Sequence, residues 1–348
     1  MRIAVVTESF APQTDPVADT SRHLVDGLIA RGHDVLVVAP GPGQTSYRGA
    51  RVVRARRLVP ASAMSTTLGG FAPDLIHVAS PRMLGALALR AASRLLVPAL
   101  VVNQDALDTA AAQWWQTRVH PRSARTLVTC EDAGRRLTSV GIGAHLWRPG
   151  IDAEEFHPRL RHDQLHDRWA RAQSPEGPLV VVGHVGSLDR EKVVRRLTDI
   201  ARLPRVRLVV IGAGAGADLL REAGAKVTGE LTGLDLARGI ASLDVLVQPR
   251  KKEMCVPGVR RALASGIPVG AFAAGGTPDV VRDGENGLLT RNDLTGSVAR
   301  LVNDDRLRAT LAASARTSVL GRSWQDAVDE LVETHYSPVI GHRIQTAV

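Results

Sequence analysis

The sequence is poor in cysteine and in aromatic residues. Cys130 and Cys255 are the only cysteines among 348 residues. They are too few for a disulfide framework or a cysteine-ligated metal site, so a reducing cytosol fits best. Aromatic residues make up 3% of the chain, and the core must therefore be built from Val, Leu, Ile and Ala. No apolar run approaches the roughly 20 residues of a spanning helix, so any membrane contact is expected to be peripheral.

The sequence also lacks a signature of secretion or of nucleic-acid binding. Met1-Arg2 runs directly into an apolar strand pattern, so we predict no signal peptide and a cytoplasmic location. The net charge is +9, which suits an anionic partner such as a nucleotide or the phospholipid surface at the inner face of a membrane. The basic residues are scattered, and no helix-turn-helix, zinc or RNA-binding pattern is present, so no nucleic-acid partner is expected.

Strand and helix patterns alternate along almost the whole chain, which is typical of parallel α/β layers. In the first half we predict strands at 2–7, 33–39, 51–55, 74–78, 99–103, 126–129 and 145–147, with helices at 17–31, 81–96 and 106–116. In the second half we predict strands at 179–185, 206–211, 226–229, 244–248 and 267–271, with helices at 191–201, 217–223 and 234–240 and a mostly helical end over 294–339.

A change of composition divides this pattern into two halves. Residues 153–178 are polar, rich in His and Arg, and end in S-P-E-G-P, and we place a linker there. We therefore predict a first domain over residues 1–160 and a second over residues 176–323. The simplest architecture is two doubly wound, Rossmann-like α/β domains that face a central crevice.

The stretch 250–266, R-K-K-E-M-C-V-P-G-V-R-R-A-L-A-S-G, follows the predicted strand 244–248. Pro257-Gly258 begins a helix, and Ser265-Gly266 ends it. The carboxylate of Glu253 and the unpaired N–H groups of this helix start are expected together at the carboxyl edge of a parallel sheet. Such an edge favours a phosphorylated ligand.

Several motifs together resemble the GT-B glycosyltransferases of family four, which use nucleotide-diphosphate sugars and retain anomeric configuration. They include R-I-A-V-V-T-E-S-F-A-P, W-R-P-G-I-D-A-E-E-F-H-P, V-G-S-L-D-R-E-K, A-L-A-S-G-I-P-V, G-G-T-P-D-V-V and D-G-E-N-G-L-L. The resemblance covers nearly the whole chain and points to the branch of actinobacterial mannosyltransferases that act on phosphatidylinositol and related lipids. It implies an acceptor-side first domain, a donor-binding second domain and a final helix, 324–345, that packs back on the first.

The resemblance implies transfer of a sugar, mannose from GDP-mannose, to a lipid or small-molecule acceptor, without a bound metal ion. In the family an arginine and a lysine offset the charge of the leaving diphosphate. Here Lys192 is kept, while the arginine position is Ser187, and Arg190 in the same loop is a candidate to replace it. Glu253 matches the carboxylate that holds the hydroxyls of the donor sugar.

Other positions depart from the family pattern. The carboxylate that grips the ribose diol falls on Arg261, which cannot accept a hydrogen bond and would suit an anion. A glycine that lets the backbone approach the sugar falls on Val256. The helix start at Pro257, Gly258 and Val259 would still add its dipole to the phosphate site.

The first domain departs from the pattern as well. The loop after the first strand carries no glycine, Asp15 in it would repel a phosphate, and Pro16 has no N–H to donate. Asp105 is retained after a later strand, and Asp105 and His77 would face the acceptor.

Each of these residues also has a simpler interpretation. A lysine at a helix start is often a surface residue, and a histidine at a strand end is more often a satisfied structural residue than a catalytic one. On this view Glu253 pairs with Lys251 or Lys252, Arg261 is solvated, and Trp114 and Trp115 pack at the domain surface rather than forming an acceptor platform. Arg51, Arg54, Arg56 and Arg57 would be a solvated face or, if they form one patch, a contact for anionic lipid.

Two further functions stay open at this point. The glycines of Gly212-Ala213-Gly214-Ala215-Gly216 follow a strand and precede Glu230, which is the pattern of a dinucleotide site in an oxidoreductase. The substituted donor positions would also fit a catalytically degenerate GT-B protein that acts as a binding or partner subunit.

Overall fold

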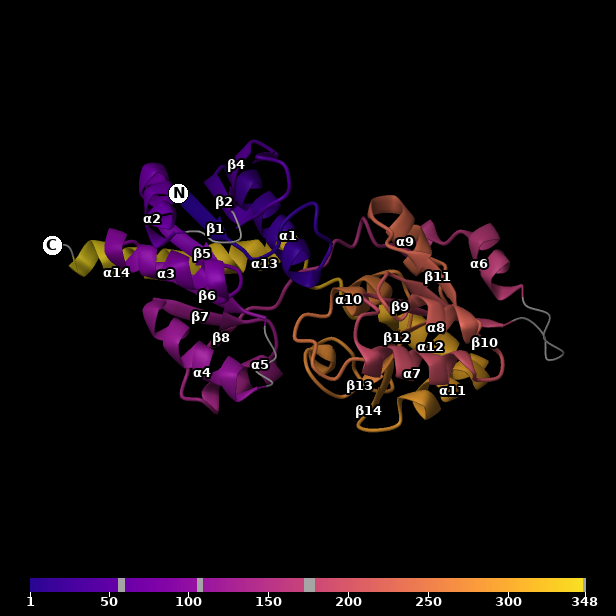
Figure 1. Cartoon of the computed structure of the whole chain (residues 1–348). Helices are drawn as coiled ribbons and strands as arrows, with labels where there is room; N and C mark the ends of the chain where they lie inside the picture. Colours follow the sequence, from indigo (N-terminus) through magenta and orange to yellow (C-terminus); the bar gives the residue numbers. More distant parts are fainter. Residues whose placement is uncertain (56–59, 105–108, 172–178, 347–348) are drawn as a thin grey trace. The chain divides into compact units, whose positions relative to one another are not determined.

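The computed structural model describes residues 1–55, 60–104, 109–171 and 179–346. The chain divides into two compact units. The first comprises Met1–Gly150 together with Trp324–Val348, and the second comprises Ile151–Ser323. In each unit helices cover a β-sheet (Figure 1). Among the described residues, no helix is both long enough and apolar enough to cross a membrane.

The first unit alternates strands and helices, as the sequence predicts. Its strands are β1 Arg2–Val6, β2 Asp34–Pro40, β3 Ser46–Tyr47, β4 Ala50–Ala55, β5 Leu75–Val78, β6 Ala99–Asn103, β7 Arg125–Val128 and β8 His145–Leu146. Its helices are α1 Pro16–Ala30, α2 Ala61–Phe71, α3 Met83–Leu95, α4 Ala110–Val119 and α5 Glu131–Thr138, followed late in the chain by α13 Trp324–Glu330, the π-helical turn Leu331–Tyr336 and α14 Ser337–Thr346. The sequence patterns missed the short β3 and the helices α2 and α5.

Within the described residues, these strands form an eight-stranded sheet in the order β3-β4-β2-β1-β5-β6-β7-β8. The pairings are parallel except for that between β3 and β4. Alternate side chains of β1 enter two separate apolar cores, Ile3 and Val5 on one face and Ala4 and Val6 on the other. The strand reads as a continuous apolar run because both of its faces are covered.

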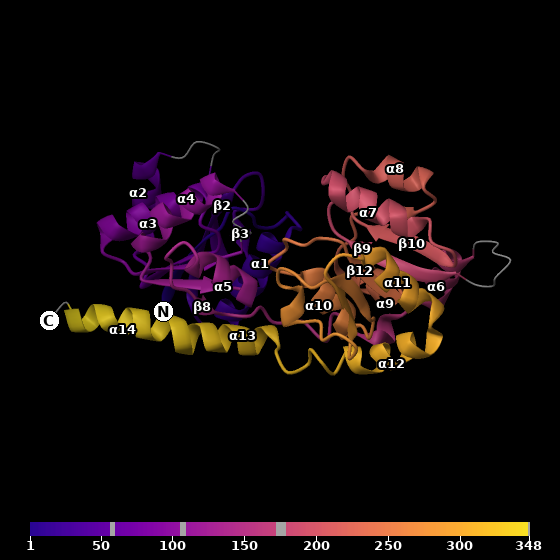
Figure 2. The same cartoon turned by 90° about the horizontal axis from the view of Figure 1, so that it is seen from below.

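The final helices belong to the first unit, and Figure 2 shows α13 and α14 as one rod along it. The buried indole of Trp147 donates from Nε1 to the Ala327 carbonyl at 2.8 Å. Gly27 on α1 faces Val328, and a Cβ at Gly27 would lie 2.8 Å from Val328 Cγ2. Helices α1 and α13 therefore approach closely because Gly27 has no side chain.

The second unit repeats the alternating pattern. Its strands are β9 Val180–Val185, β10 Val206–Ile211, β11 Lys226–Gly229, β12 Val245–Gln248, β13 Val269–Phe272 and β14 Gly287–Thr290. Its helices are α6 Asp163–Ala170, α7 Glu191–Ala201, α8 Ala217–Glu222, α9 Gly233–Ala241, α10 Pro257–Ala264, α11 Leu294–Asn303 and α12 Asp305–Ala315. Its described strands form a six-stranded parallel sheet in the order β11-β10-β9-β12-β13-β14.

The predicted linker, 153–178, is folded up to Arg171, so that part of the prediction is wrong. The boundary between the units lies after Gly150, within the range assigned to the first domain. Phe156 and Trp169 are buried in the core of the second unit, and Leu165 packs against it. The His- and Arg-rich segment was mistaken for a linker because its apolar residues are few and widely spaced in the sequence, although Phe156, Leu165 and Trp169 all contact the core.

Candidate functional site

The candidate site lies at the carboxyl edge of the second sheet, where the strand order reverses. Strands β10 and β12 flank β9, so the chain leaves β9 and β12 toward opposite sides. Side-by-side carboxyl ends with diverging connections leave space for a ligand in α/β sheets. The loops that follow these strands, 186–190 and 249–256, are called the switch-point loops below.

The first switch-point loop is held by the neighbouring loop after β10. Gly186 donates its N–H to the Ile211 carbonyl at 3.0 Å, and Leu188 donates to the Ala213 carbonyl at 2.9 Å. A Cβ at Gly212 would lie 2.1 Å from the Gly186 carbonyl oxygen, so only glycine permits this approach. The glycine pattern that resembled a dinucleotide fingerprint therefore has a packing role here.

Asp189 accepts a backbone N–H of the same glycine loop. Its Oδ1 accepts the Ala215 N–H at 3.2 Å, and its Oδ2 accepts the Ser187 hydroxyl at 2.6 Å. The Ser187 hydroxyl, followed by the Ala215 N–H, lowers the pKa of the Asp189 carboxyl. A carboxylate at the position where a pyrophosphate would bind argues against the oxidoreductase alternative.

The other predicted residues of the first loop face solvent. Arg190 is the N-cap of α7 and makes no side-chain cap hydrogen bond, and Lys192 follows in the first turn. Both are exposed, as is Ser187. The charge of Arg190 lowers the pKa of Glu253, so Arg190 lies near the carboxylate of the second loop.

Glu253 is the central residue of the second switch-point loop. Its Oε2 accepts from Gln248 Nε2 at 3.3 Å and lies 3.7 Å from Arg250 Nη1. Burial raises the pKa of Glu253, and Arg250, Arg190 and the Gln248 hydrogen bond oppose that rise. The simpler interpretation paired Glu253 with Lys251 or Lys252, and of these Lys251 donates to the Arg291 carbonyl at 2.7 Å.

The loop after β13 fixes the backbone of Glu253. The Gly276 N–H donates to the Glu253 carbonyl at 2.8 Å. Gly275 has φ +64°, and a Cβ there would lie 2.4 Å from the same carbonyl oxygen. The G-G-T-P motif therefore determines where the carboxylate of Glu253 stands.

Helix α10 begins beside Glu253, as the sequence predicts. Its N-cap, Val256, makes no side-chain cap hydrogen bond, and Pro257 is at the first position. The side chains of Val256 and Val259 are buried in the core, so these residues could meet a ligand only through their backbone. Gly258 lies half-buried beside Val185.

Arg261 lies in the last turn of α10, where its guanidinium carbon is 5.0 Å from the centre of the Phe156 ring. Phe156 is buried in the core of the second unit. A guanidinium over an aromatic ring is a stabilising cation–π arrangement. Arg261 is therefore a packed, half-buried residue, and contact of Arg261 with an anion stays a prediction.

His184, which the sequence analysis missed, lies beneath the first switch-point loop. It is 1% exposed on β9, and its Nδ1 is 3.3 Å from the Val247 carbonyl oxygen. Because a carbonyl can only accept, Nδ1 carries the proton and Nε2 is an acceptor. Burial lowers the pKa of His184 to about 4. The sequence signal that could have identified His184 was its place as a polar residue inside the apolar run V-V-V-G-H-V.

His77, predicted to face the acceptor, is instead a buried structural residue. It is 1% exposed on β5, and its Nδ1 lies 2.7 Å from the Tyr336 hydroxyl of the final helical segment. Burial lowers its pKa to about 3, so it is neutral at physiological pH. Strand β5 is central in the sheet and both of its faces are covered, and a catalytic role for His77 stays a prediction. Asp105 lies outside the described residues.

The basic and aromatic surface residues of the first unit also have specific positions. The Arg54 guanidinium donates to the carbonyls of Gln44 at 2.9 Å, Pro40 at 3.1 Å and Ala11 at 2.5 Å, so it ties loops together and is not a solvated residue. Arg51 is exposed, whereas Arg56 and Arg57 lie outside the described residues. Trp115 donates to the Pro81 carbonyl at 2.6 Å, while Trp114 is 57% exposed.

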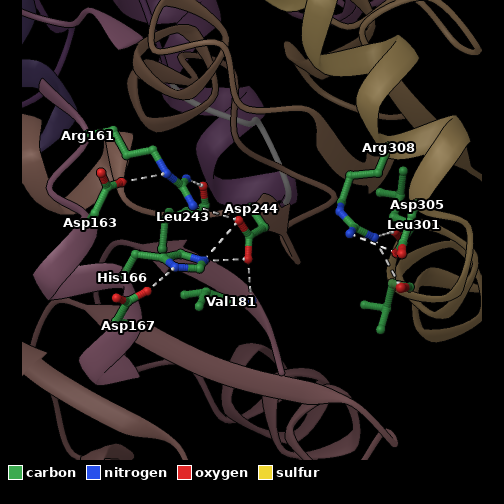
Figure 3. A network of polar contacts seen from close by, with 11 residues as sticks. Arg161, Asp163, His166, Asp167, Val181, Leu243, Asp244, Leu301, Asp305 and Arg308 are labelled. Atoms are coloured by element: carbon green, nitrogen blue, oxygen red, sulfur yellow. Dashed lines mark hydrogen bonds and ion pairs between the residues drawn. The ribbon is translucent and has the colours of Figure 1, made fainter. Parts of the chain in front are cut away.

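A second polar network lies at the opposite, amino edge of the second sheet (Figure 3). Asp244 accepts from His166 Nε2 at 3.0 Å, from Arg161 Nη2 at 3.2 Å and from the Val181 N–H at 2.9 Å. These contacts join α6 and the segment before it to the starts of β9 and β12. They fasten the segment that was predicted as a linker, and they lie away from the switch-point loops.

Comparisons with known proteins point to one family. Residues 17–155 match the family described as Glycosyltransferase Family 4, and residues 180–304 match that described as Glycosyl transferases group 1. The GDP-mannose-dependent alpha-mannosyltransferase of Mycobacterium tuberculosis (strain CDC 1551 / Oshkosh) is 37% identical over 100% of this chain and 99% of its own. The protein of the same description from Corynebacterium glutamicum (strain ATCC 13032) is 32% identical, over 98% and 89%.

Solved structures share the fold. The Anabaena HepE protein in complex with UDP-glucose superposes with a TM-score of 0.81 at 19% identity, covering 97% of this chain and 100% of that chain. Sucrose-phosphate synthase from Thermosynechococcus elongatus gives a TM-score of 0.80 at 18% identity, covering 98% and 99%. At such identities the likeness concerns the arrangement of elements in the two parallel-sheet units.

Proposed function

This chain belongs to glycosyltransferase family 4 and has its GT-B fold, and from that premise we propose that it transfers mannose from GDP-mannose. The acceptor is a lipid or a small molecule, and the anomeric configuration is retained. The observation that supports this most directly is the 37% identity, over the whole chain, to a relative described as a GDP-mannose-dependent alpha-mannosyltransferase.

The switch-point loops suit the donor half of this reaction. In the transfer the bond between the anomeric carbon and the diphosphate oxygen breaks, and a bond to an acceptor hydroxyl forms. The diphosphate leaves with the electron pair, so negative charge grows on it. The unpaired N–H groups at the starts of α7 and α10 and the charge of Lys192 would stabilise that charge without a metal ion.

Glu253 is proposed to bind the sugar itself. A half-buried carboxylate such as that of Glu253 can accept two or more O–H hydrogen bonds, as a sugar diol requires. Gln248 and the Gly275-Gly276 backbone hold Glu253 in place from behind. The neighbouring Arg250 and Arg190 oppose the rise in pKa that burial causes, which favours the anionic, acceptor form of the carboxylate.

The proposal is tested with the purified chain and a panel of nucleotide sugars. We expect GDP-mannose to be consumed fastest, with GDP released and an α-mannoside formed, whose anomeric configuration NMR identifies. Transfer from another donor alone, or inversion, would correct the proposal. Absence of turnover with every donor and acceptor tried would support the reading of a degenerate binding subunit.

Glu253→Gln provides the matched residue test. It keeps the shape of the side chain but removes its charge, and it should lower kcat/KM roughly 10- to 150-fold, the cost of one or two charged hydrogen bonds. The control is Glu285→Gln, which removes an exposed carboxylate paired with Arg282 in the same unit. Equal losses in both variants would show that Glu253 has no specific role.

Contact with an anionic membrane at the cytoplasmic face is proposed as part of this function. The net charge of +9 and the exposed Trp114, with the Arg118 guanidinium 5.1 Å from the centre of its ring, support it. Cosedimentation with vesicles containing anionic lipid should exceed that with neutral vesicles and should fall with salt. Equal recovery with both vesicle types would count against the contact.

A further inference from the structure

Arg250 joins the two switch-point loops, although no motif of the sequence singled it out. It follows Pro249 directly after β12, and its side chain is 20% exposed. Its Nη2 donates to the Ser187 carbonyl at 3.0 Å, across from the other loop. Its Nη1 is 3.7 Å from Glu253 Oε2, an ion-pair distance beyond that of a good hydrogen bond. The guanidinium therefore retains donors that can serve a ligand.

The position of this guanidinium bears on the loss of the family arginine at position 187. The family pattern has an arginine at 187, but here the Ser187 hydroxyl donates to Asp189. The positive charge missing at 187 is nevertheless present in space, because Arg250 contacts the backbone of that same residue. The cation comes from the second loop instead of the first.

The charge of Arg250 also acts on the ionisable groups around it. Arg250 lowers the pKa of Glu253, of Asp189 and of His184, though it is not the main cause in any of them. These residues belong to β9 and to both switch-point loops. The contacts of Arg250 with Ser187 and Glu253 place its guanidinium between the two loops, and these effects on pKa agree with that position.

His184 supplies a second indication that a ligand belongs here. Among the described residues, its buried Nε2 has no hydrogen-bond partner, and such an unpaired acceptor costs free energy unless something satisfies it. A Cβ at Gly186 would lie 3.5 Å from His184 Nε2 and 3.9 Å from Arg250 Nη2. The imidazole and the guanidinium thus converge on the Gly186 backbone.

We propose that Arg250 binds the diphosphate of the donor, in place of the arginine that Ser187 replaces. This inference rests on the proposed function. The guanidinium has a planar fork of N–H donors that matches phosphate oxygens, and its contact with the Ser187 carbonyl holds it in place beforehand. Together with Lys192 it restores the pair of cations that the leaving group requires.

The test compares the affinities of GDP and GMP by calorimetric titration, because the two ligands differ only in the second phosphate. The wild-type chain should bind GDP more tightly than GMP. Arg250→Ala should weaken GDP binding about 10- to 150-fold and leave GMP binding nearly unchanged. Lys252→Ala is the matched control, since it removes a positive charge from an exposed position of the same loop, and it should preserve the ratio.

A charge swap separates a ligand role from a structural one. Ser187→Arg combined with Arg250→Ser returns the arginine to the first loop and should recover at least roughly tenfold of the lost GDP affinity. An unchanged ratio of GDP to GMP affinity in Arg250→Ala would overturn the proposal. An equal loss of affinity for GDP and GMP, together with a lower thermal midpoint of the variant, would overturn it too. Arg250 would then only support the loops.

Failure of the proposed function would look different. In that case the wild-type chain would bind neither GDP nor UDP and would turn over no donor. The inference about Arg250 would then lose its basis as well. If the wild-type chain turns over GDP-mannose while Arg250→Ala matches it in GDP affinity, the function stands and the role of Arg250 alone is refuted.

Discussion

The two units share a parallel α/β architecture, but two helices of the first unit, α1 and α3, and two of the second, α7 and α10, begin in opposite ways. In the first unit Asp15 accepts the Val17 N–H at 2.9 Å and the Ala18 N–H at 3.1 Å, at the start of α1. Glu8 accepts the Leu84 N–H at 2.5 Å at the start of α3. In the second unit the N-cap residues of α7 and α10, Arg190 and Val256, make no side-chain cap hydrogen bond.

The difference shows how one topology can serve stability or binding. The first N–H groups of a helix need partners, and a carboxylate supplied by the chain stabilises the helix by about 0.5–2 kcal/mol. A helix start without such a cap keeps its N–H groups and its dipole for an external anion. At these four helices the first unit uses its own carboxylates, and the second has no side-chain cap.

Arg190→Asp would make α7 resemble α1, and we expect the largest effect from it. A carboxylate at the N-cap would occupy the first N–H groups and repel the ligand, so GDP affinity should fall roughly 10- to 100-fold while the thermal midpoint holds or rises. Arg190→Ser adds a neutral cap and also removes the arginine, so the difference between the two variants isolates the carboxylate. Calorimetry that finds equal affinities in the two would contradict the comparison.

Gly275→Ala tests the backbone support of Glu253, the carboxylate beside the uncapped start of α10. The matched control is Gly284→Ala, since Gly284 has φ +77° and nothing within 4 Å of an added Cβ. Both variants share the strain of a positive φ, but only Gly275→Ala meets the Glu253 carbonyl. It should lose at least about 1 kcal/mol more stability and also lower turnover. Similar melting and activity in both variants would show that the loop tolerates the contact.

Asp15→Ala removes a cap from the first unit. Stability should fall by about 0.5–2 kcal/mol, as for other lost N-caps, and thermal melting measures it. GDP affinity should not change, because the start of α1 is not part of the proposed anion site. Asp293→Ala, which removes a similar cap from α11, is the control. A gain in GDP affinity in Asp15→Ala would mean that the uncapped N–H groups of α1 also bind the phosphate.

The last prediction concerns the buried histidines, His77 in the first unit and His184 in the second. Their pKa values are lowered from 6.5 to about 3 and about 4. Below pH 6.5 these histidines bind protons in the unfolded chain but stay neutral in the folded chain. The free energy of unfolding is therefore highest above that pH and declines as the pH falls toward 4. His77→Asn should flatten this decline in melting measured from pH 7 to pH 4. A slope identical to that of the wild-type chain would show that His77 titrates alike in both states.

Much of the fold follows from periodicity alone. The strands β1, β2, β9 and β10 are apolar runs bounded by turns, and the structure confirms them to within a residue at each end. The patterns failed where composition misled. The segment 153–171 looked like a linker although Phe156 and Trp169 enter a core, and α2 has too few charged residues to show an amphipathic pattern.

The candidate site divides in the same way. Glu253, Lys192 and the start of α10 could be identified from local motifs, because a helix start and its neighbours are encoded over a few residues. His77 could not be judged, since its partner Tyr336 is 259 residues away. Arg250 was missed because its partner Ser187 follows a different strand, β9, and His184 was missed because its partner Val247 is on β12.

The sequence by itself determined two α/β halves, the order of their elements and the family. These depend on hydrophobic periodicity and on motifs whose residues are close in the chain. Only the tertiary structure decided which distant polar residues meet: that Asp189 bonds to Ala215, that Glu8 caps α3, and that Arg250 reaches the loop after β9. Parallel strands bring distant loops to one edge, and the pairing of charges there depends on distances in space that no local pattern records.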